Sequence, residues 1–191
     1  VHTWIGHVLS TSGPEGSAYW FSEGFTDFFA RRILHRASLI DDAAFAEILS
    51  EQARRYLENP HREAPNAVVV ERFWSDSNAS QLPYQRGDLL ATRINEEIRR
   101  VSAGARSFDD LILGMLDRAR RERWRPDSDA LLATIAEATS SAFAAWVRSV
   151  AIDGQAIELP RRLVDPVALA LTEAMIQSFE IGFDVQASGE S

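Results

Sequence analysis

Residues 20–29 read Trp-Phe-Ser-Glu-Gly-Phe-Thr-Asp-Phe-Phe, and this stretch decides the predicted fold. Apolar residues recur in it at helical spacing and form one stripe, which comprises Phe21, Phe25, Phe28, Phe29 and Ile33. The pattern predicts a helix to about residue 37, with Ser22 as its N-cap. The opposite side carries Glu23, Asp27, Ala30 and Leu34. Because that side is also rather apolar, we expect other helices to cover most of this one.

Glu23 needs a partner in such a helix, because burying an unpaired charge is costly. A salt bridge to an arginine, or hydrogen bonding at a helix end, would supply one. The other interpretation is that Glu23 binds a metal ion. That interpretation depends on the residues at the start of the chain, which read Val-His-Thr-Trp from Val1 onward.

The runs at residues 1–4 and 20–27 together resemble the zinc site of the glycyl aminopeptidase family. These enzymes are thermolysin-like zinc metallopeptidases that usually carry a PDZ domain after the catalytic domain. Their first motif, His-Glu-x-x-His, places two imidazoles one turn apart on a helix. Val1 and His2 match its last two positions. The resemblance implies that His2 and Glu23 are zinc ligands and that Asp27 supports the ligand Glu23.

The first histidine and the catalytic glutamate of that motif would lie among the three positions before Val1. Catalytic zinc has three protein ligands and an open position for water. His2 and Glu23 supply two of the three, and the general base that activates the water would be missing. We therefore expect a fragment of a peptidase that binds zinc poorly and is inactive alone.

Tyr84 is the second candidate site residue. Residues 82–87 read Leu-Pro-Tyr-Gln-Arg-Gly and resemble the Tyr-x-x-Gly element of the same family. The resemblance implies that Tyr84 stabilises the tetrahedral oxyanion, and a fixed phenol donor suits that task. The alternative is a half-buried tyrosine at a helix start whose hydroxyl contacts water. Gly87 would let this helix pack closely against the central one.

Composition limits the classes of partner. The chain has 191 residues, is 46% hydrophobic and carries a formal charge of −8, which argues against nucleic-acid or anionic-membrane binding. It has no cysteine, and no stretch approaches the ~18 apolar residues that span a bilayer. The expected partners are a peptide or protein substrate, the rest of the catalytic domain and a possible PDZ domain in the full-length protein. A bacterial cell envelope and the cytoplasm both remain open as compartments.

Helical periodicity continues along the rest of the chain. It predicts a helix after the N-cap Asp41, helices that begin at Ser107, at Pro126 and Asp127, and from Ser140 onward, and another that Leu82 opens. Ser107 and Asp110 form a weak capping box. Residues 75–80 are predicted as a loop, and residues 67–74 as either a short strand or an irregular apolar segment. His7, His35 and His61 are interpreted as surface, loop or helix-end residues.

The predicted fold is mainly α, a multi-helix bundle resembling the helical C-terminal lobe of thermolysin-like metallopeptidases. Residues 1–160 would form this lobe, and residues 161–191 an extension toward an absent PDZ-like domain. The predicted function is a fragment of a zinc-dependent metallopeptidase or aminopeptidase. The alternatives are a noncatalytic helical interaction module derived from a peptidase fold and an unrelated helical domain. In an unrelated domain, we would not expect the side chains of His2, Glu23 and Tyr84 to lie close together in space.

Overall fold

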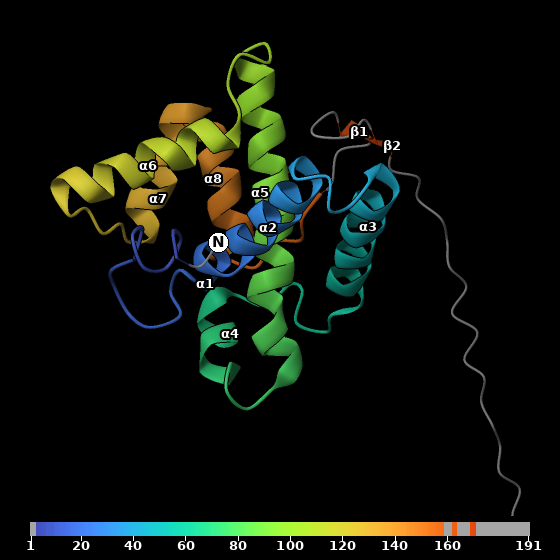
Figure 1. The fold of residues 1–191 in the computed structure, drawn as a ribbon. Helices are drawn as coiled ribbons and strands as arrows, with labels where there is room; N and C mark the ends of the chain where they lie inside the picture. Colours follow the sequence, from blue (N-terminus) through green and yellow to red (C-terminus); the bar gives the residue numbers. More distant parts are fainter. Residues whose placement is uncertain (1–2, 159–161, 164–168, 171–191) are drawn as a thin grey trace, which may run out of the picture.

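A computed structural model describes residues 3–158, 162–163 and 169–170 of the chain. This part is mainly helical (Figure 1), which confirms the predicted fold class. Its helices are α1 (Tyr19–Ser22), α2 (Gly24–Arg36), α3 (Asp42–Glu58), α4 (Asn66–Arg72), α5 (Ser77–Val101), α6 (Phe108–Glu122), α7 (Ser128–Ala138) and α8 (Ser141–Ala151). None of the described helices is long and apolar enough to cross a bilayer.

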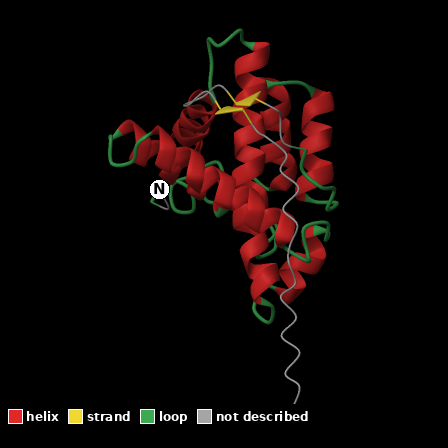
Figure 2. Ribbon diagram, turned by 90° about the vertical axis from the view of Figure 1, so that its right-hand side faces the viewer, coloured by secondary structure: helices red, strands yellow, loops and turns green. Residues whose placement is uncertain are grey.

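The long helix α5 is the centre of the arrangement (Figure 1). Helix α2 crosses α5, α3 lies along one side of the bundle, and α6, α7 and α8 lie on the other side. Helix α4 packs near the N-terminal end of α5. The view turned by 90° shows the same bundle, with most of its helices side by side (Figure 2). Helix α5 is therefore placed to position residues from several elements.

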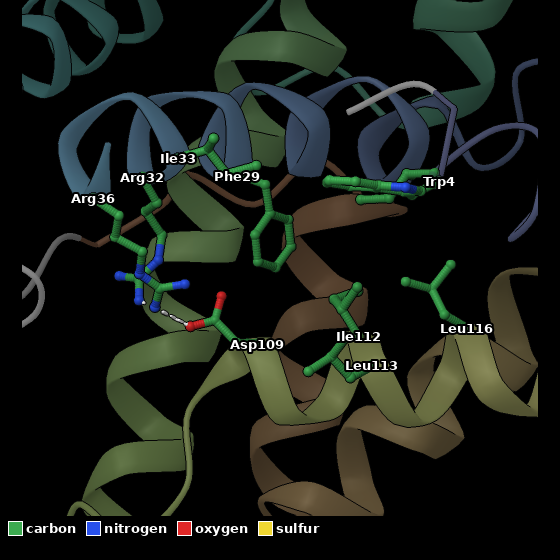
Figure 3. A pocket seen from close by; sticks show the side chains of 10 residues that line it. Trp4, Phe29, Arg32, Ile33, Arg36, Asp109, Ile112, Leu113 and Leu116 are labelled. Carbon is green, nitrogen blue, oxygen red and sulfur yellow. Dashed lines mark hydrogen bonds and ion pairs between the residues drawn. The ribbon is translucent and has the colours of Figure 1, made fainter. Parts of the chain in front are cut away.

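Aromatic rings from α2 fill much of the core. The ring centroids of Phe25 and Phe108 lie 4.9 Å apart, and those of Phe25 and Trp20 lie 5.5 Å apart. Edge-to-face pairs of this kind add to the stability that burial alone gives. The predicted stripe is buried from Phe21 to Phe29, but Ile33 is 39% exposed. Ile33 lies at a pocket between α2 and α6 (Figure 3).

The helix starts predicted at Asp41, Ser107, Asp127 and Ser140 are confirmed. Asp41 and Asp127 accept hydrogen bonds from the N–H groups of Ala44 and Ala130, and Ser140 caps α8. The capping box of Ser107 and Asp110 is also present. These caps satisfy N–H groups that the first turn of a helix leaves without partners.

Two segments differ from the predictions. Residues 67–74 lie largely in α4 instead of in a strand or an irregular segment. Val69, which lies on this helix, packs in the core. Residues 77–80 of the predicted loop are helical, because Asp76 accepts hydrogen bonds from the N–H groups of Asn78 and Ala79 and caps the start of α5. Leu82 therefore lies within α5, and Pro83 is inside the helix. Proline lacks an N–H group, but the N–H groups that Asp76 caps belong to Asn78 and Ala79, so Pro83 leaves the first turn of α5 intact.

The C-terminal prediction is only partly covered by the described residues. Arg162–Leu163 and Leu169–Ala170 form the short antiparallel strands β1 and β2. The helix or strand expected from Pro166 onward is thus a strand at 169–170. The remainder of the extension predicted for residues 161–191 lies outside the described residues, and the boundary at residue 160 stays a prediction.

Candidate functional site

Glu23 lies at the junction between α1 and α2. Its N–H donates to the carbonyl of Tyr19, and its own carbonyl accepts from the N–H of Asp27. Helical hydrogen bonding therefore runs through the junction, so α2 begins without a side-chain cap and the prediction of Ser22 as N-cap is wrong. The Ser22 hydroxyl instead donates to Glu23 Oε1 at 3.1 Å. Glu23 itself is half-buried.

Two glycines bring the backbones of α2 and α5 into contact. A Cβ atom on Gly24 would lie 2.2 Å from the Cα of Gly87. A Cβ atom on Gly87 would lie 2.0 Å from the carbonyl oxygen of Trp20. Real Cβ atoms do not approach other atoms so closely, so both positions require glycine. This confirms the close packing predicted for Gly87, and it places Tyr84, one turn earlier on α5, beside Glu23.

The phenol of Tyr84 lies beside the carboxylate of Glu23, and the two side chains interact. Burial and the negative charge of Glu23 raise the pKa of the Tyr84 phenol to about 12, and the charge of Asp27 adds to the effect. At neutral pH the phenol is thus a hydrogen-bond donor. The structure brings together Glu23, Tyr84 and Asp27, whereas His2 lies outside the described residues.

Tyr19 belongs to the same cluster, although the sequence analysis did not single it out. Its hydroxyl donates to Glu15 Oε1 at 3.2 Å, and burial together with Glu15 and Glu23 raises its pKa. Its charge in turn contributes to the raised pKa of Tyr84. The sequence signal was the position of Tyr19 one turn before Glu23, on the side that Glu23 shares.

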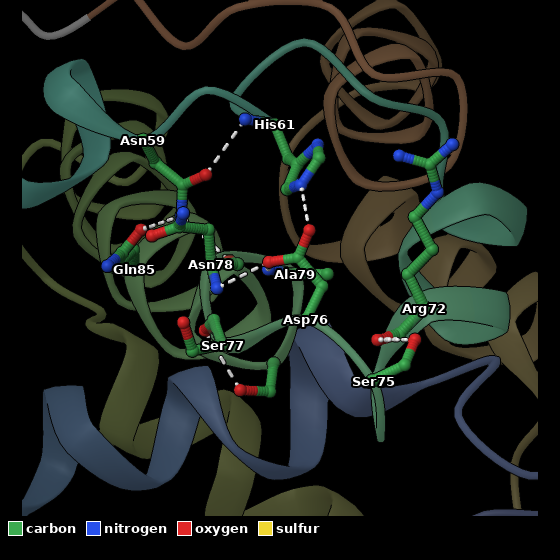
Figure 4. A network of polar contacts seen from close by, with 10 residues as sticks. Asn59, His61, Arg72, Ser75, Asp76, Ser77, Asn78, Ala79 and Gln85 are labelled. Atoms are coloured by element: carbon green, nitrogen blue, oxygen red, sulfur yellow. Dashed lines mark hydrogen bonds and ion pairs between the residues drawn. The ribbon is translucent and has the colours of Figure 1, made fainter.

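A polar network supports the N-terminal end of α5 (Figure 4). Asn59 donates through Nδ2 to Gln85 Oε1 at 2.8 Å, and it accepts from the N–H of His61. His61 Nε2 lies 2.7 Å from Asp76 Oδ2. The interpretation of His61 as a helix-end residue is confirmed, but the imidazole is half-buried and ties the loop after α3 to the cap of α5. Gln85 is the residue after Tyr84, so this network holds the turn that carries the phenol.

A buried ion pair fixes α2 against α5 further along. Arg31 donates to both carboxylate oxygens of Asp88, at 2.5 and 2.7 Å. Both side chains are almost fully buried. Such a bidentate pair has a strict geometry, so it fixes how the two helices lie along each other. Asp88 follows Gly87 directly, which places the ion pair next to the glycine contact.

Among residues 3–158, no three histidine, aspartate or glutamate side chains gather closely enough to hold a metal ion. The Glu23 carboxylate accepts a hydrogen bond from the Ser22 hydroxyl and interacts with Tyr84. This donor set does not by itself fit the three protein ligands that catalytic zinc takes.

The described site is a glutamate and a tyrosine joined across two closely packed helices of an α-helical lobe. The sequence model of the M61 glycyl aminopeptidase family matches residues 11–89, a segment that contains Glu23, Asp27 and Tyr84. This match supports a peptidase M61 fragment. No match was found among curated proteins.

Proposed function

We propose that this chain provides the helical part of the catalytic centre of a zinc metallopeptidase. Glu23 would be one zinc ligand, with His2 as a second, and Asp27 would support Glu23. Tyr84 would donate a hydrogen bond to the oxyanion that forms during peptide hydrolysis. The observation that carries the proposal is that the close contact of α2 and α5 at Gly24 and Gly87 brings Tyr84 beside Glu23, inside the segment that matches the peptidase family.

The electrostatics of Tyr84 support the role of a donor. A phenol whose pKa is raised to about 12 keeps its proton at neutral pH, so it can donate to a developing negative charge. The backbone contact at Gly24 and Gly87 fixes the helix that carries it. A donor held by a rigid scaffold needs little reorganisation when charge develops, and this is the condition for effective oxyanion stabilisation.

Zinc would polarise the substrate carbonyl and activate the attacking water. A complete His-Glu-x-x-His motif around His2 would need a histidine and a glutamate in the three positions before Val1. We propose that a histidine and a glutamate at those positions would complete a site with His2 and Glu23. The substrate would be a peptide or protein. The rest of a thermolysin-like catalytic domain and a PDZ domain would be neighbours in a longer protein.

Zinc calorimetry tests this proposal. The chain and a version extended by His-Glu-Ala before Val1 are each titrated with and without Glu23→Ala. We expect tight binding only in the extended chain, and its loss in Glu23→Ala. Two controls keep the result specific: Glu15→Ala removes a nearby carboxylate, and Tyr84→Phe removes the oxyanion donor, and both should retain zinc.

Two results would count against the proposal. One is an extension that gives no gain in zinc affinity, and the other is an affinity that does not depend on Glu23. Either would favour a noncatalytic helical interaction module derived from a peptidase fold. Circular dichroism of each variant shows whether a variant that has lost zinc affinity is still folded.

A further inference from the structure

Trp74 lies on the surface, in the turn between α4 and α5, and its side chain is 81% exposed. This is the highest exposed fraction among the large apolar side chains of the described residues. Covering apolar surface of this size is favourable, so an exposed indole is a good contact for a ligand. A single exposed tryptophan can lie anywhere on a protein, so its position relative to the proposed site decides whether it matters.

A row of three rings connects Trp74 to the proposed site, and we call Tyr19, Phe73 and Trp74 the aromatic row. The ring centroids of Phe73 lie 5.0 Å from those of Trp74 and 4.7 Å from those of Tyr19. Tyr19 is one turn before Glu23, whose N–H donates to the Tyr19 carbonyl. Glu23 raises the pKa of Tyr19, and Tyr19 raises that of Tyr84. The aromatic row therefore begins beside Glu23 and Tyr84 and ends at the exposed Trp74.

The backbone around Trp74 is held by hydrogen bonds. The carbonyl of Arg72 accepts from the N–H groups of Ser75 and Asp76, at 3.0 and 2.9 Å, and closes the turn that contains Trp74. The side chain of Asp76 in turn caps α5. Helix α4 itself lies next to α1 at the N-terminal end of α5 (Figure 1). A surface that is already fixed in place loses little freedom on binding, which favours affinity.

The charges next to Trp74 favour a neutral ligand group. Glu71 and Arg72 precede Phe73 and carry opposite charges. The carboxylate of Asp76 lies 2.7 Å from the imidazole of His61. Neither sign of charge therefore dominates around the indole, and apolar and ring contacts remain as the basis of selection.

The length of the aromatic row sets the position of the ligand group. The two ring distances place Trp74 within about 10 Å of Tyr19, and an extended peptide covers that distance with about three residues. We propose that Phe73 and Trp74 bind an aromatic side chain of the peptide substrate, about three residues along the peptide from Tyr19. This inference rests on the proposed function, because it takes the peptide to lie across Glu23 and Tyr84.

Four tetrapeptide amides that differ only in the last residue test the preference: Ala-Ala-Ala followed by phenylalanine, cyclohexylalanine, lysine or alanine. Binding is followed by NMR through the indole N–H signal of Trp74, which Trp74→Phe identifies among the five tryptophans of the chain. The phenylalanine peptide should shift this signal at concentrations about tenfold lower than the alanine and lysine peptides require. Cyclohexylalanine has a similar size but no aromatic ring, so its peptide should bind roughly threefold more weakly than the phenylalanine peptide.

The ring signals of Tyr84 report on the other end of the peptide, and Tyr84→Phe identifies them among the three tyrosines. The phenylalanine tetrapeptide should shift the signals of both Trp74 and Tyr84. Phenylalanine amide alone should shift only the signal of Trp74, because it is too short to reach Tyr84. A tetrapeptide that shifts the Trp74 signal and leaves Tyr84 unchanged would overturn the placement of the peptide.

Surface variants locate the contact without disturbing the core. In Trp74→Ala, followed through Tyr84, the phenylalanine peptide should bind only as tightly as the alanine peptide, whereas Trp74→Phe should keep the order of the four peptides. Trp4→Ala is the matched control, because Trp4 is 47% exposed and lines the pocket between α2 and α6, and it should bind as the parent chain does. Urea unfolding shows that each variant is folded.

Three results would overturn the inference: equal binding of the phenylalanine and cyclohexylalanine peptides, a lysine peptide that binds as tightly as either, or an unchanged preference in Trp74→Ala. These measurements use the chain without zinc, so they are separate from the calorimetry. Loss of the aromatic preference leaves Glu23 as a proposed zinc ligand. A zinc affinity that does not depend on Glu23 removes the proposed function, while a preference for phenylalanine at Trp74 would still show a peptide-binding surface.

Discussion

At the scale of single residues, Tyr84 shows how a fold changes the chemistry of a side chain. Its phenol has an ordinary pKa of 10.0, and burial together with Glu23 and Asp27 raises this pKa to about 12. The folded state therefore holds the proton more tightly than the unfolded chain. This contribution to stability is fully present below pH 10 and is lost as the pH rises from 10 through about 12.

Replacing Glu23 tests the cause of this shift. In Glu23→Gln the pKa of Tyr84 should fall from about 12 toward its ordinary value of 10.0 without reaching it, because the negative charge is lost and burial remains. Absorbance at the phenolate band during alkaline titration measures the change, with Tyr84→Phe identifying the signal among the three tyrosines. Glu15→Gln is the control, since Glu15 bonds to Tyr19 and should leave the Tyr84 titration in place. An unchanged titration in Glu23→Gln would show that the charge of Glu23 does not act on Tyr84.

At the scale of elements, the contact between α2 and α5 depends on the absence of two side chains. Gly87→Ala should destabilise the protein by about 3 kcal/mol, the upper end of the usual cost of overpacking, because its Cβ would lie 2.0 Å from a backbone oxygen. Gly114→Ala in α6 is the matched control. Its Cβ would meet nothing within 4 Å, so it should gain about 1 kcal/mol from helix propensity.

Urea unfolding measures both substitutions. The urea unfolding curves also show whether Gly87→Ala still folds. The alkaline titration of Tyr84 in the folded variant shows whether the phenol has moved away from Glu23. If Gly87→Ala matched the parent chain in stability, the backbone contact between α2 and α5 would be looser than the structure shows.

The stability of the protein depends on pH through Asp76, the N-cap of α5. The hydrogen bond with His61 lowers the pKa of Asp76, and the N–H groups of Ala79 and Asn78 lower it further. A lowered pKa means that this stabilisation is present above pH 3.8 and is lost as the pH falls below it. Asp76→Asn should therefore unfold at lower urea than the parent chain at pH 7, and the difference should shrink in acid.

Asp41→Asn gives the comparison, since Asp41 caps α3 and makes no ion pair with a histidine in the described structure. Its effect at neutral pH should be smaller than that of Asp76→Asn. Equal effects of the two substitutions at all pH values would show that the hydrogen bond with His61 does not contribute to the stabilisation by Asp76.

At the scale of the whole molecule, the buried pair of Arg31 and Asp88 ties the two central helices together. Asp88→Asn should cost about 3–5 kcal/mol, because it leaves a buried guanidinium without its counter-charge. The double variant Arg31→Met with Asp88→Leu should recover much of this loss, since neither charge is then buried. Thermal unfolding of the two variants and the parent chain measures both effects. A double variant as unstable as Asp88→Asn would show that packing, rather than charge, dominates this contact.

Local signals in the sequence predicted most of the helices correctly. The helix starts at Asp41, Ser107, Asp127 and Ser140 depend on hydrogen bonds between residues close in sequence, so local signals predict where these helices begin. The start of α5 was missed because polar residues at 75–80 resemble a loop, while Asp76 caps a helix there. The prediction of a strand or an irregular segment at residues 67–74 was wrong, because a short apolar run does not distinguish these structures from a helix, and contact with the core decides between them.

The sequence by itself determined the helical class, the amphipathic helix after Glu23 and the choice of Glu23 and Tyr84 as candidates. These depend on periodicity, capping and short motifs, all of which act over a few residues. Only the tertiary structure decided that the side chains of Glu23 and Tyr84 interact, that Arg31 pairs with Asp88, and that a pocket opens between α2 and α6. The physical reason is that these contacts join residues far apart in the chain, and backbone approach at Gly24 and Gly87 sets the distance between the two central helices.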